Sequence, residues 1–187
     1  MELNRYPKVI SPSQNLLVVK RIIFLLVFTA LGTFLFGQKT SSKYARDVQS
    51  IDAIMKAYYE VFSGSSTDPW QFERDKFIHS ENAVITRWDE NGKTGPHSLE
   101  AEYVPVLIAP KENWYEKELK RTVTHYGNIA QVWSAFEVTT EPNGAAIMRG
   151  LTSIQLHFEN GRWWIDSWTS MQETEEDKFV DAFLKKQ

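Results

Sequence analysis

Apolar-rich runs dominate the last third of the chain, and short turn-forming segments separate them. The runs extend over Trp114–Thr140, Ala145–Phe158 and Arg162–Gln172, and an Asn-Gly pair stands in each intervening segment, 142–144 and 160–161. Long apolar runs joined by Gly-bearing turns are typical of antiparallel strands that follow one another in a sheet. The pattern therefore predicts an antiparallel meander near the C-terminus.

Helical spacing replaces this pattern earlier in the chain. Apolar residues recur every three or four positions between Ile51 and Phe62, which places them on one face of a helix. Ser98 is a predicted N-cap, and Pro105 and Pro110 are expected to disturb the helix that follows it. The three predicted helices are Asp47–Phe62, Trp70–Ile78 and the segment that starts after Ser98.

The order of these elements predicts the fold class. A strand over Ala83–Trp88 and a turn at 89–92 are expected before the third helix, with His97 in a Gly-Pro loop. Helices followed by a long meander predict an α+β fold with the helices on one face of the sheet. The tail, 174–187, has acidic residues first, lysines last and an apolar stripe between them. It is expected to form a docked terminal helix, and a solvated, frayed tail is the alternative.

The N-terminal part of the chain has the physical design of an export signal. A Lys-Arg pair precedes the apolar run Ile22–Phe36, and a small residue and a polar segment follow it. We therefore expect 1–38 to be a signal peptide and 39–46 a linker. The alternative is an uncleaved membrane anchor, which needs roughly 20 apolar residues. Because the segment before the Lys-Arg pair is long for such a signal, translation that begins near Val18 or Val19 is a further hypothesis.

Composition narrows the chemistry that the chain can use. The 187 residues include no cysteine, which excludes disulfides, thiolate metal sites and a thiol nucleophile. The net charge is −3, and it becomes −6 if 1–38, with four basic residues and one acidic residue, is removed. Nucleic acid and acidic membrane surfaces are poor partners for such a domain, apart from membrane contact through an unprocessed leader. The four histidines lack metal-ligand spacing, so we predict no metal and no cofactor.

Several local motifs stand in a defined order along the chain. They are the Tyr58-Tyr59 helix, the Phe77–Ile85 step from helix to strand, Gly127–Ala130, Arg149-Gly150 and Gly161–Ile165. In order and spacing they resemble the nuclear transport factor 2-like superfamily, and within it the SnoaL-like or bacterial domains of unknown function. The resemblance assigns 47–173 to one domain. It implies a cone-shaped, curved antiparallel sheet wrapped around about three N-terminal helices, with a deep pocket, and a homodimer through the outer sheet face.

Strand alternation selects the side chains that are expected to face this pocket. Arg121 and His125 share the more apolar face of the first run. An ordinary ion pair is the alternative for Arg121, and a satisfied core position is the alternative for His125. The predicted ligand-binding residues are Tyr58, Arg87, Trp88, Arg121, His125, Trp133, Ser153, Gln155 and Trp168, with Arg87 or Arg121 holding a polar group.

The steroid isomerases of the superfamily imply a check on catalysis. In those enzymes a tyrosine of the first helix and a protonated aspartate stabilise an enolate, while a second aspartate moves the proton. Tyr58 matches the tyrosine, but the aspartate positions fall near Arg87 and Ser153, which argues against that reaction. His125 and Asp166 are the remaining candidates for a general base.

Three hypotheses for the function stay open. The first is an exported domain, periplasmic or secreted, that binds a small, partly apolar molecule and need not catalyse a reaction. The second is a small-molecule isomerase, dehydratase or hydrolase of the SnoaL-like type. The third is a periplasmic protein-interaction module whose exposed sheet binds a partner.

Overall fold

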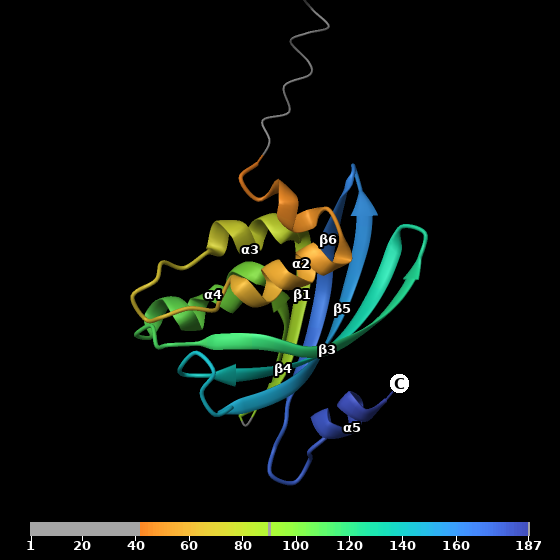
Figure 1. Ribbon diagram of the computed structural model, residues 1–187. Coiled ribbons are helices and arrows are strands. Elements are labelled where there is room, and N and C mark those ends of the chain that lie inside the picture. The colour runs from red at the N-terminus through yellow and green to blue at the C-terminus, as the bar shows by residue number, and fades with distance from the viewer. Residues whose placement is uncertain (1–41, 90, 187) are drawn as a thin grey trace, which may run out of the picture. The chain divides into compact units, whose positions relative to one another are not determined.

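One sheet of six strands organises the domain, which the computed structural model describes over residues 42–89 and 91–186. The strands are β1 His79–Asp89, β2 Gly92–Ser98, β3 Tyr115–Tyr126, β4 Ile129–Thr139, β5 Met148–Glu159 and β6 Arg162–Gln172. Their order is β2-β1-β6-β5-β4-β3, and the sheet is curved and unclosed (Figure 1). All neighbouring strands are antiparallel except β1 and β6, which are parallel.

The helices that precede β3 lie along the inner side of this curve (Figure 1). The helical elements are the 3-10 helix η1 Ala45–Val48, α2 Ile51–Glu60, α3 Phe72–Ile78, α4 Leu99–Ile108 and α5 Val180–Lys185. α2 contacts β3 and β6, α3 contacts β1 and β6, and α4 contacts β1 and β2. The arrangement confirms the predicted α+β fold, in which a curved sheet wraps around the helices that precede the meander.

Local capping determines where α2 begins. Ser50 has an extended backbone (φ −146°), and its side chain accepts a hydrogen bond from the Ala53 N–H (3.1 Å). A serine that satisfies a free N–H in this way starts a helix at the next residue. The helix therefore begins at Ile51 rather than at the predicted Asp47, and η1 forms a separate turn before it.

Ser98 caps α4 in the same way, as the sequence predicts. Its side chain accepts a hydrogen bond from the Ala101 N–H (3.4 Å). The helix continues through Pro105 to its end at Ile108, although proline removes one backbone donor. Burial of Leu99 and Tyr103, each 5% exposed, holds this helix against the rest of the domain.

The sheet contains more strands than the sequence predicts. Gly127 has φ +56°, a conformation that glycine adopts readily, and it turns the chain between β3 and β4, so the first predicted run is two strands. β2 forms over the segment that was expected to be a loop because of Gly95, Pro96 and His97. Proline is tolerated there because β2 is an edge strand that pairs only with β1.

Two β-bulges change which side chains face the helices. In β3, the pairing with β4 shifts between Glu118 and Lys120, so Arg121 lies on the same inner face as Glu116 and Glu118. Simple alternation separates Glu116 and Glu118 from Arg121, and this part of the prediction is wrong. An extra residue in one strand shifts the alternation by one position, because two residues then stand opposite one.

The second bulge, in β6, also changes which side chains of its strand face the helices. Ile165 lies opposite Leu156 and Trp168 lies opposite Ile154, and all four side chains face the core. Alternation puts Ile165 and Trp168 on opposite faces, which is wrong because Asp166 is the extra residue between the two halves of the strand.

Helix α5 covers part of the outer face of the sheet. Val180 and Phe183 are buried against Ala135 of β4. Ile154 and Leu156 do not pack under this helix, because they belong to the core on the inner face. The terminal helix therefore shields the side of the sheet that the other helices leave uncovered.

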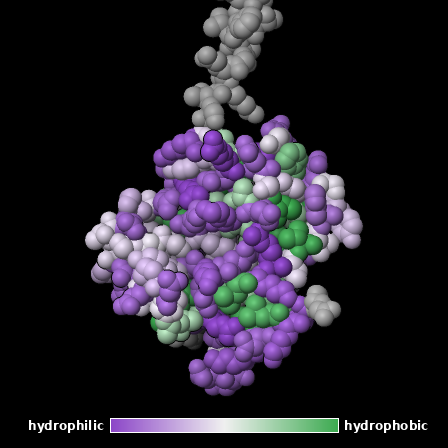
Figure 2. Space-filling model, viewed as in Figure 1, coloured by the Kyte–Doolittle hydropathy of each residue, from purple (hydrophilic) through white to green (hydrophobic). Residues whose placement is uncertain are grey.

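The surface shown in Figure 2 is largely hydrophilic, with small apolar patches. No helix within the described residues is long and apolar enough to span a bilayer. The predicted signal peptide, 1–38, lies outside the part of the chain that the structure describes, so export stays a prediction.

Candidate functional site

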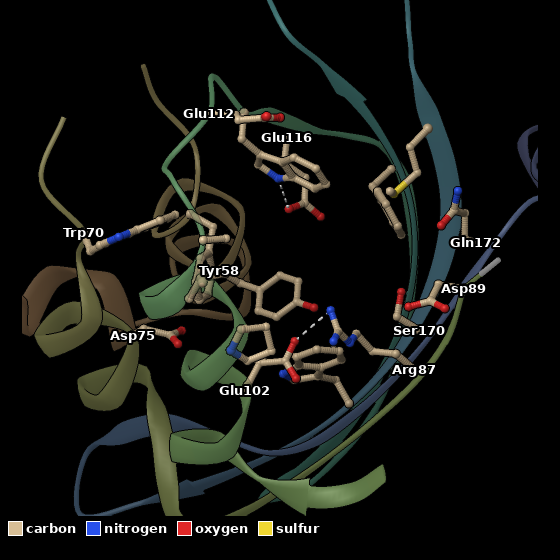
Figure 3. A pocket seen from close by; sticks show the side chains of 18 of the residues that line it. Tyr58, Trp70, Asp75, Arg87, Asp89, Glu102, Glu112, Glu116, Ser170 and Gln172 are labelled. Atoms are coloured by element: carbon tan, nitrogen blue, oxygen red, sulfur yellow. Dashed lines mark hydrogen bonds and ion pairs between the residues drawn. The ribbon is translucent and has the colours of Figure 1, made fainter. Parts of the chain in front are cut away.

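A cavity of about 830 Å³ lies between the helices and the inner face of the sheet (Figure 3). Residues of α2, α3 and α4 form one side, and residues of β1, β3, β4, β5 and β6 form the other. Its wall includes four tryptophans, Trp70, Trp88, Trp114 and Trp168. A cavity of this size, in which aromatic side chains and polar groups converge, is typical of small-molecule sites.

Tyr58 projects into the cavity from α2 (Figure 3). Its ring packs edge-on against Trp168, with 6.0 Å between ring centroids, and against Tyr59, with 5.1 Å. Burial raises the pKa of the Tyr58 hydroxyl well above its ordinary value. The hydroxyl is therefore neutral and can donate or accept a hydrogen bond inside the cavity.

Glu116 of β3 places a carboxyl group in the same cavity (Figure 3). Burial raises the pKa of this carboxyl to about 7, and the hydrogen bond that Trp114 Nε1–H donates to Oε2 (3.3 Å) opposes the rise. Among the described residues no basic side chain forms an ion pair with Glu116. The Glu116 N–H donates to the Ser63 hydroxyl (3.0 Å), which ties this strand to the end of α2.

Arg87 enters the cavity from β1 already paired with an acid. Its guanidinium lies 3.1 Å from one carboxylate oxygen of Glu102, and His97 Nε2 lies 2.6 Å from the other. Glu102 therefore joins β1, β2 and α4 through its two oxygens. The pairing also neutralises Arg87 within the cavity, so this residue carries little uncompensated positive charge.

A buried polar cluster forms the base of the cavity. The Tyr103 hydroxyl donates to Asp75 Oδ2 (2.8 Å), and His79 Nδ1 lies 2.9 Å from the Asp75 carbonyl oxygen and 3.3 Å from its carboxylate. Burial raises the pKa of Tyr103, and Asp75 adds to the rise. Within the described residues, His79 Nε2 and Trp168 Nε1 are buried without a hydrogen-bond partner, and both residues line the cavity.

Solved structures of other proteins share this architecture. A protein of unknown function with a cystatin-like fold from Nostoc punctiforme aligns with a TM-score of 0.51 at 14% identity, over 65% of this chain and 90% of its own. A proposed scytalone dehydratase from Novosphingobium aromaticivorans aligns with a TM-score of 0.51 at 11% identity, over 66% and 82%. A nuclear transport factor 2-like protein of unknown function from Shewanella baltica aligns at 0.47 and 13% identity, over 74% and 100%.

The domain has a cystatin-like, nuclear transport factor 2-like fold. The resemblance predicted from the sequence motifs is thereby confirmed at the level of the fold. No protein-family model and no curated protein matches the sequence, so the similarity lies in the three-dimensional arrangement.

Four of the residues predicted to bind a ligand line the cavity of this nuclear transport factor 2-like domain. They are Tyr58, Arg87, Trp88 and Trp168. Arg121 lies on the inner face but pairs with Asp52 (3.2 Å) and Glu118 (2.9 Å) away from the cavity. Arg121 therefore forms the ordinary ion pair that is the alternative to ligand binding at this position.

The two predicted general bases also lie away from the cavity. His125 is exposed near the turn after β3, where its Nε2 lies 2.7 Å from the Gly127 carbonyl oxygen. Asp166 pairs with His157 at 2.8 Å. Neither residue approaches Tyr58 in the way that the enzyme hypothesis requires.

Trp133, Ser153 and Gln155 point to the outer face of the sheet, contrary to their predicted position in the pocket. Trp133 lies opposite Ser153, and it is 42% exposed. Ile154, which follows Ser153, is fully buried on the inner face. The large apolar side chains of β5 fill the core, so the polar positions between them face outward.

Glu116, Glu102 and Asp75 line the cavity but are not among the residues that the sequence predicts to bind a ligand. His79 follows directly after the predicted helix Trp70–Ile78. His79 does lie at the end of α3, but its ring also reaches the wall of the cavity. Glu116 is placed on the wrong face because the bulge after Glu118 is invisible in the alternation. Charged residues surround Glu116 at the start of this strand, so no local signal distinguishes it from its neighbours. In the described residues, no group of His, Asp and Glu is arranged to hold a metal ion.

Proposed function

We propose that this domain binds a small, largely apolar molecule in the cavity between its helices and its sheet. The cavity of about 830 Å³ carries the proposal, because aromatic residues of several elements line it and its polar groups also come from different elements. Tyr58 offers a neutral hydroxyl and Glu116 a carboxyl, which can orient a ligand that the tryptophans hold by contact area. The proposal requires no catalysis.

Two further parts of the proposal concern location and assembly. Export is supported by the apolar run that follows Lys20-Arg21. A homodimer is supported by Val84, Trp133 and Met171, which are 40–45% exposed on the outer face of the sheet. Exposed apolar side chains on one sheet face are a common feature of subunit contacts.

Native mass spectrometry tests assembly and occupancy in one experiment. Protein purified from its natural host is expected to show twice the mass of one chain, together with the mass of a retained small molecule. Trp133→Glu should yield the monomer, because it places a charge in the proposed contact. If the unsubstituted protein has the mass of one chain, the proposed homodimer is wrong. Ligand binding is then tested by the titration described next.

A bulky substitution in the cavity wall is expected to block binding. Gln172→Trp fills space at the β6 wall, whereas Glu81→Trp adds the same side chain at an exposed position outside the cavity. Titration with the neutral fluorescent probe N-phenyl-1-naphthylamine should show about tenfold weaker binding for Gln172→Trp and unchanged binding for Glu81→Trp. Failure of the probe to bind the unsubstituted protein, or equal binding by both variants, contradicts a ligand site in this cavity.

A further inference from the structure

We propose that the cavity selects an organic cation, an ammonium group carried on an apolar body. The inference rests on the proposed function and assigns the chemical class of its ligand. Three independent features support it: the balance of charge in the cavity, the aromatic composition of the wall, and buried polar atoms of the wall that have no partner.

The charged side chains of the wall are mostly acidic. Five acidic residues and two basic residues line the cavity. Of the two bases, Arg87 is paired with Glu102 at 3.1 Å, and Lys111 donates to the Asp68 carbonyl oxygen at 2.6 Å. Neither pairs with Glu116. An anionic ligand would therefore meet net repulsion, whereas a cation would meet an unpaired carboxylate.

Aromatic side chains make up much of the remaining wall. The electron-rich faces of Trp and Tyr attract organic cations, and desolvation of the site strengthens the attraction. Lys111 already uses this contact, since its ammonium lies 4.5 Å from the centre of the Trp70 ring. Trp114, which hydrogen-bonds Glu116 through its indole N–H, places an aromatic ring next to the carboxylate. A ring and a carboxylate side by side recognise an ammonium group by two means at once.

Three further atoms of the wall lack partners. His79 Nδ1 lies 2.9 Å from a carbonyl oxygen, which only accepts, so Nδ1 carries a hydrogen. His79 Nε2 is unpartnered, and His79 is 3% exposed. Trp168 Nε1 and Arg87 Nε, both donors, are also unpartnered, and Trp168 is 8% exposed. Buried polar groups are normally satisfied, so these atoms mark a wall that a bound molecule completes.

A pair of isosteric probes isolates the charge. Benzyltrimethylammonium and neopentylbenzene differ in shape only by the exchange of nitrogen for carbon, and phenylacetate supplies an anion. At about pH 8.5, above the pKa of Glu116 of about 7, we expect benzyltrimethylammonium to bind about tenfold tighter than neopentylbenzene, with phenylacetate weakest. Tryptophan fluorescence or calorimetry measures the three dissociation constants.

Glu116→Gln should reduce the preference for the cation to about threefold or less, because it removes the charge and keeps the shape. Glu81→Gln, which removes the same charge from an exposed position outside the cavity, should retain the full preference.

Equal or tighter binding of neopentylbenzene overturns the cation inference, as does a preference that survives in Glu116→Gln. Both of those outcomes leave the cavity as a binding site. Binding of none of the three probes overturns the inference too, and the N-phenyl-1-naphthylamine titration then decides whether the proposed function falls with it.

Discussion

Replacing Glu116 by Gln is expected to stabilise the domain by about 2–3 kcal/mol at about pH 9 and by almost nothing at about pH 4. The cause is the position of the carboxyl group in the cavity, where burial raises its pKa from 4.5 to about 7 and no basic side chain of the described residues compensates its charge. Ionising Glu116 at high pH therefore opposes folding. Glutamine has the same shape and carries no charge, so it avoids this cost.

The sign of the pH dependence follows from the two pKa values. The folded state holds the proton more tightly than the unfolded state, so the stability that the protonated carboxyl supplies is complete below pH 4.5. It is lost as the pH rises through about 7. Urea unfolding across this range measures the effect as a difference between the unsubstituted protein and the variant.

The control for this series is Glu81→Gln, which removes an exposed carboxylate. Its unfolding free energy should follow that of the unsubstituted protein across the whole pH range, because exposed charges have little influence on stability. If Glu116→Gln instead differs from the unsubstituted protein by a constant amount at every pH, the carboxyl does not titrate with a raised pKa in the cavity.

Asp75→Ala is expected to destabilise the domain by about 3 kcal/mol, the largest loss among the changes considered. Asp75 is 1% exposed, and its carboxylate accepts the hydrogen bond of the buried Tyr103 hydroxyl at 2.8 Å. Removing the acceptor leaves that hydroxyl without a partner, and removing the side chain leaves a void at the base of the cavity. Both effects oppose folding.

The matched control is Asp52→Ala, on α2. The Asp52 side chain is 90% exposed, although it lies 3.2 Å from Arg121, so its loss should change the unfolding free energy by about 0.5 kcal/mol or less. Tyr103→Phe supplies a second comparison, because Asp75→Ala should cost less once the Tyr103 hydroxyl is absent. Urea unfolding that shows equal losses for Asp75→Ala and Asp52→Ala contradicts a role of the buried hydrogen bond.

Local signals in the sequence predict the elements that depend on neighbouring residues. Helical spacing identifies α2, and Ser98 identifies the start of α4, because a helix is held by contacts three and four positions apart. The turn at Asn160-Gly161 is equally local, since Asn160 and Gly161 have φ of +52° and +79°. The same reasoning places Tyr58 on the buried face of the helix, where it lines the cavity.

The composition of the cavity depends on contacts between distant residues, so local signals are not sufficient. Glu116 and Arg121 share the inner face because the bulge after Glu118 shifts the pairing of β3 with β4, and a bulge is set by the partner strand. Glu102 and Arg87 meet only when α4 packs beside β1. His125 and Trp133 lie on the same predicted strand run, yet the fold sends one to an exposed turn and the other to the outer face.

The sequence by itself determined the α+β class, the main helices, the meander and the likeness to nuclear transport factor 2-like proteins. These features follow from hydrophobic periodicity and turn residues, which act over a few neighbouring positions. Tertiary structure alone decided which side of each strand faces the cavity, and so which acids and aromatic residues meet there. One inserted residue in a strand reverses every side chain that follows, and only pairing with the next strand shows where that residue stands.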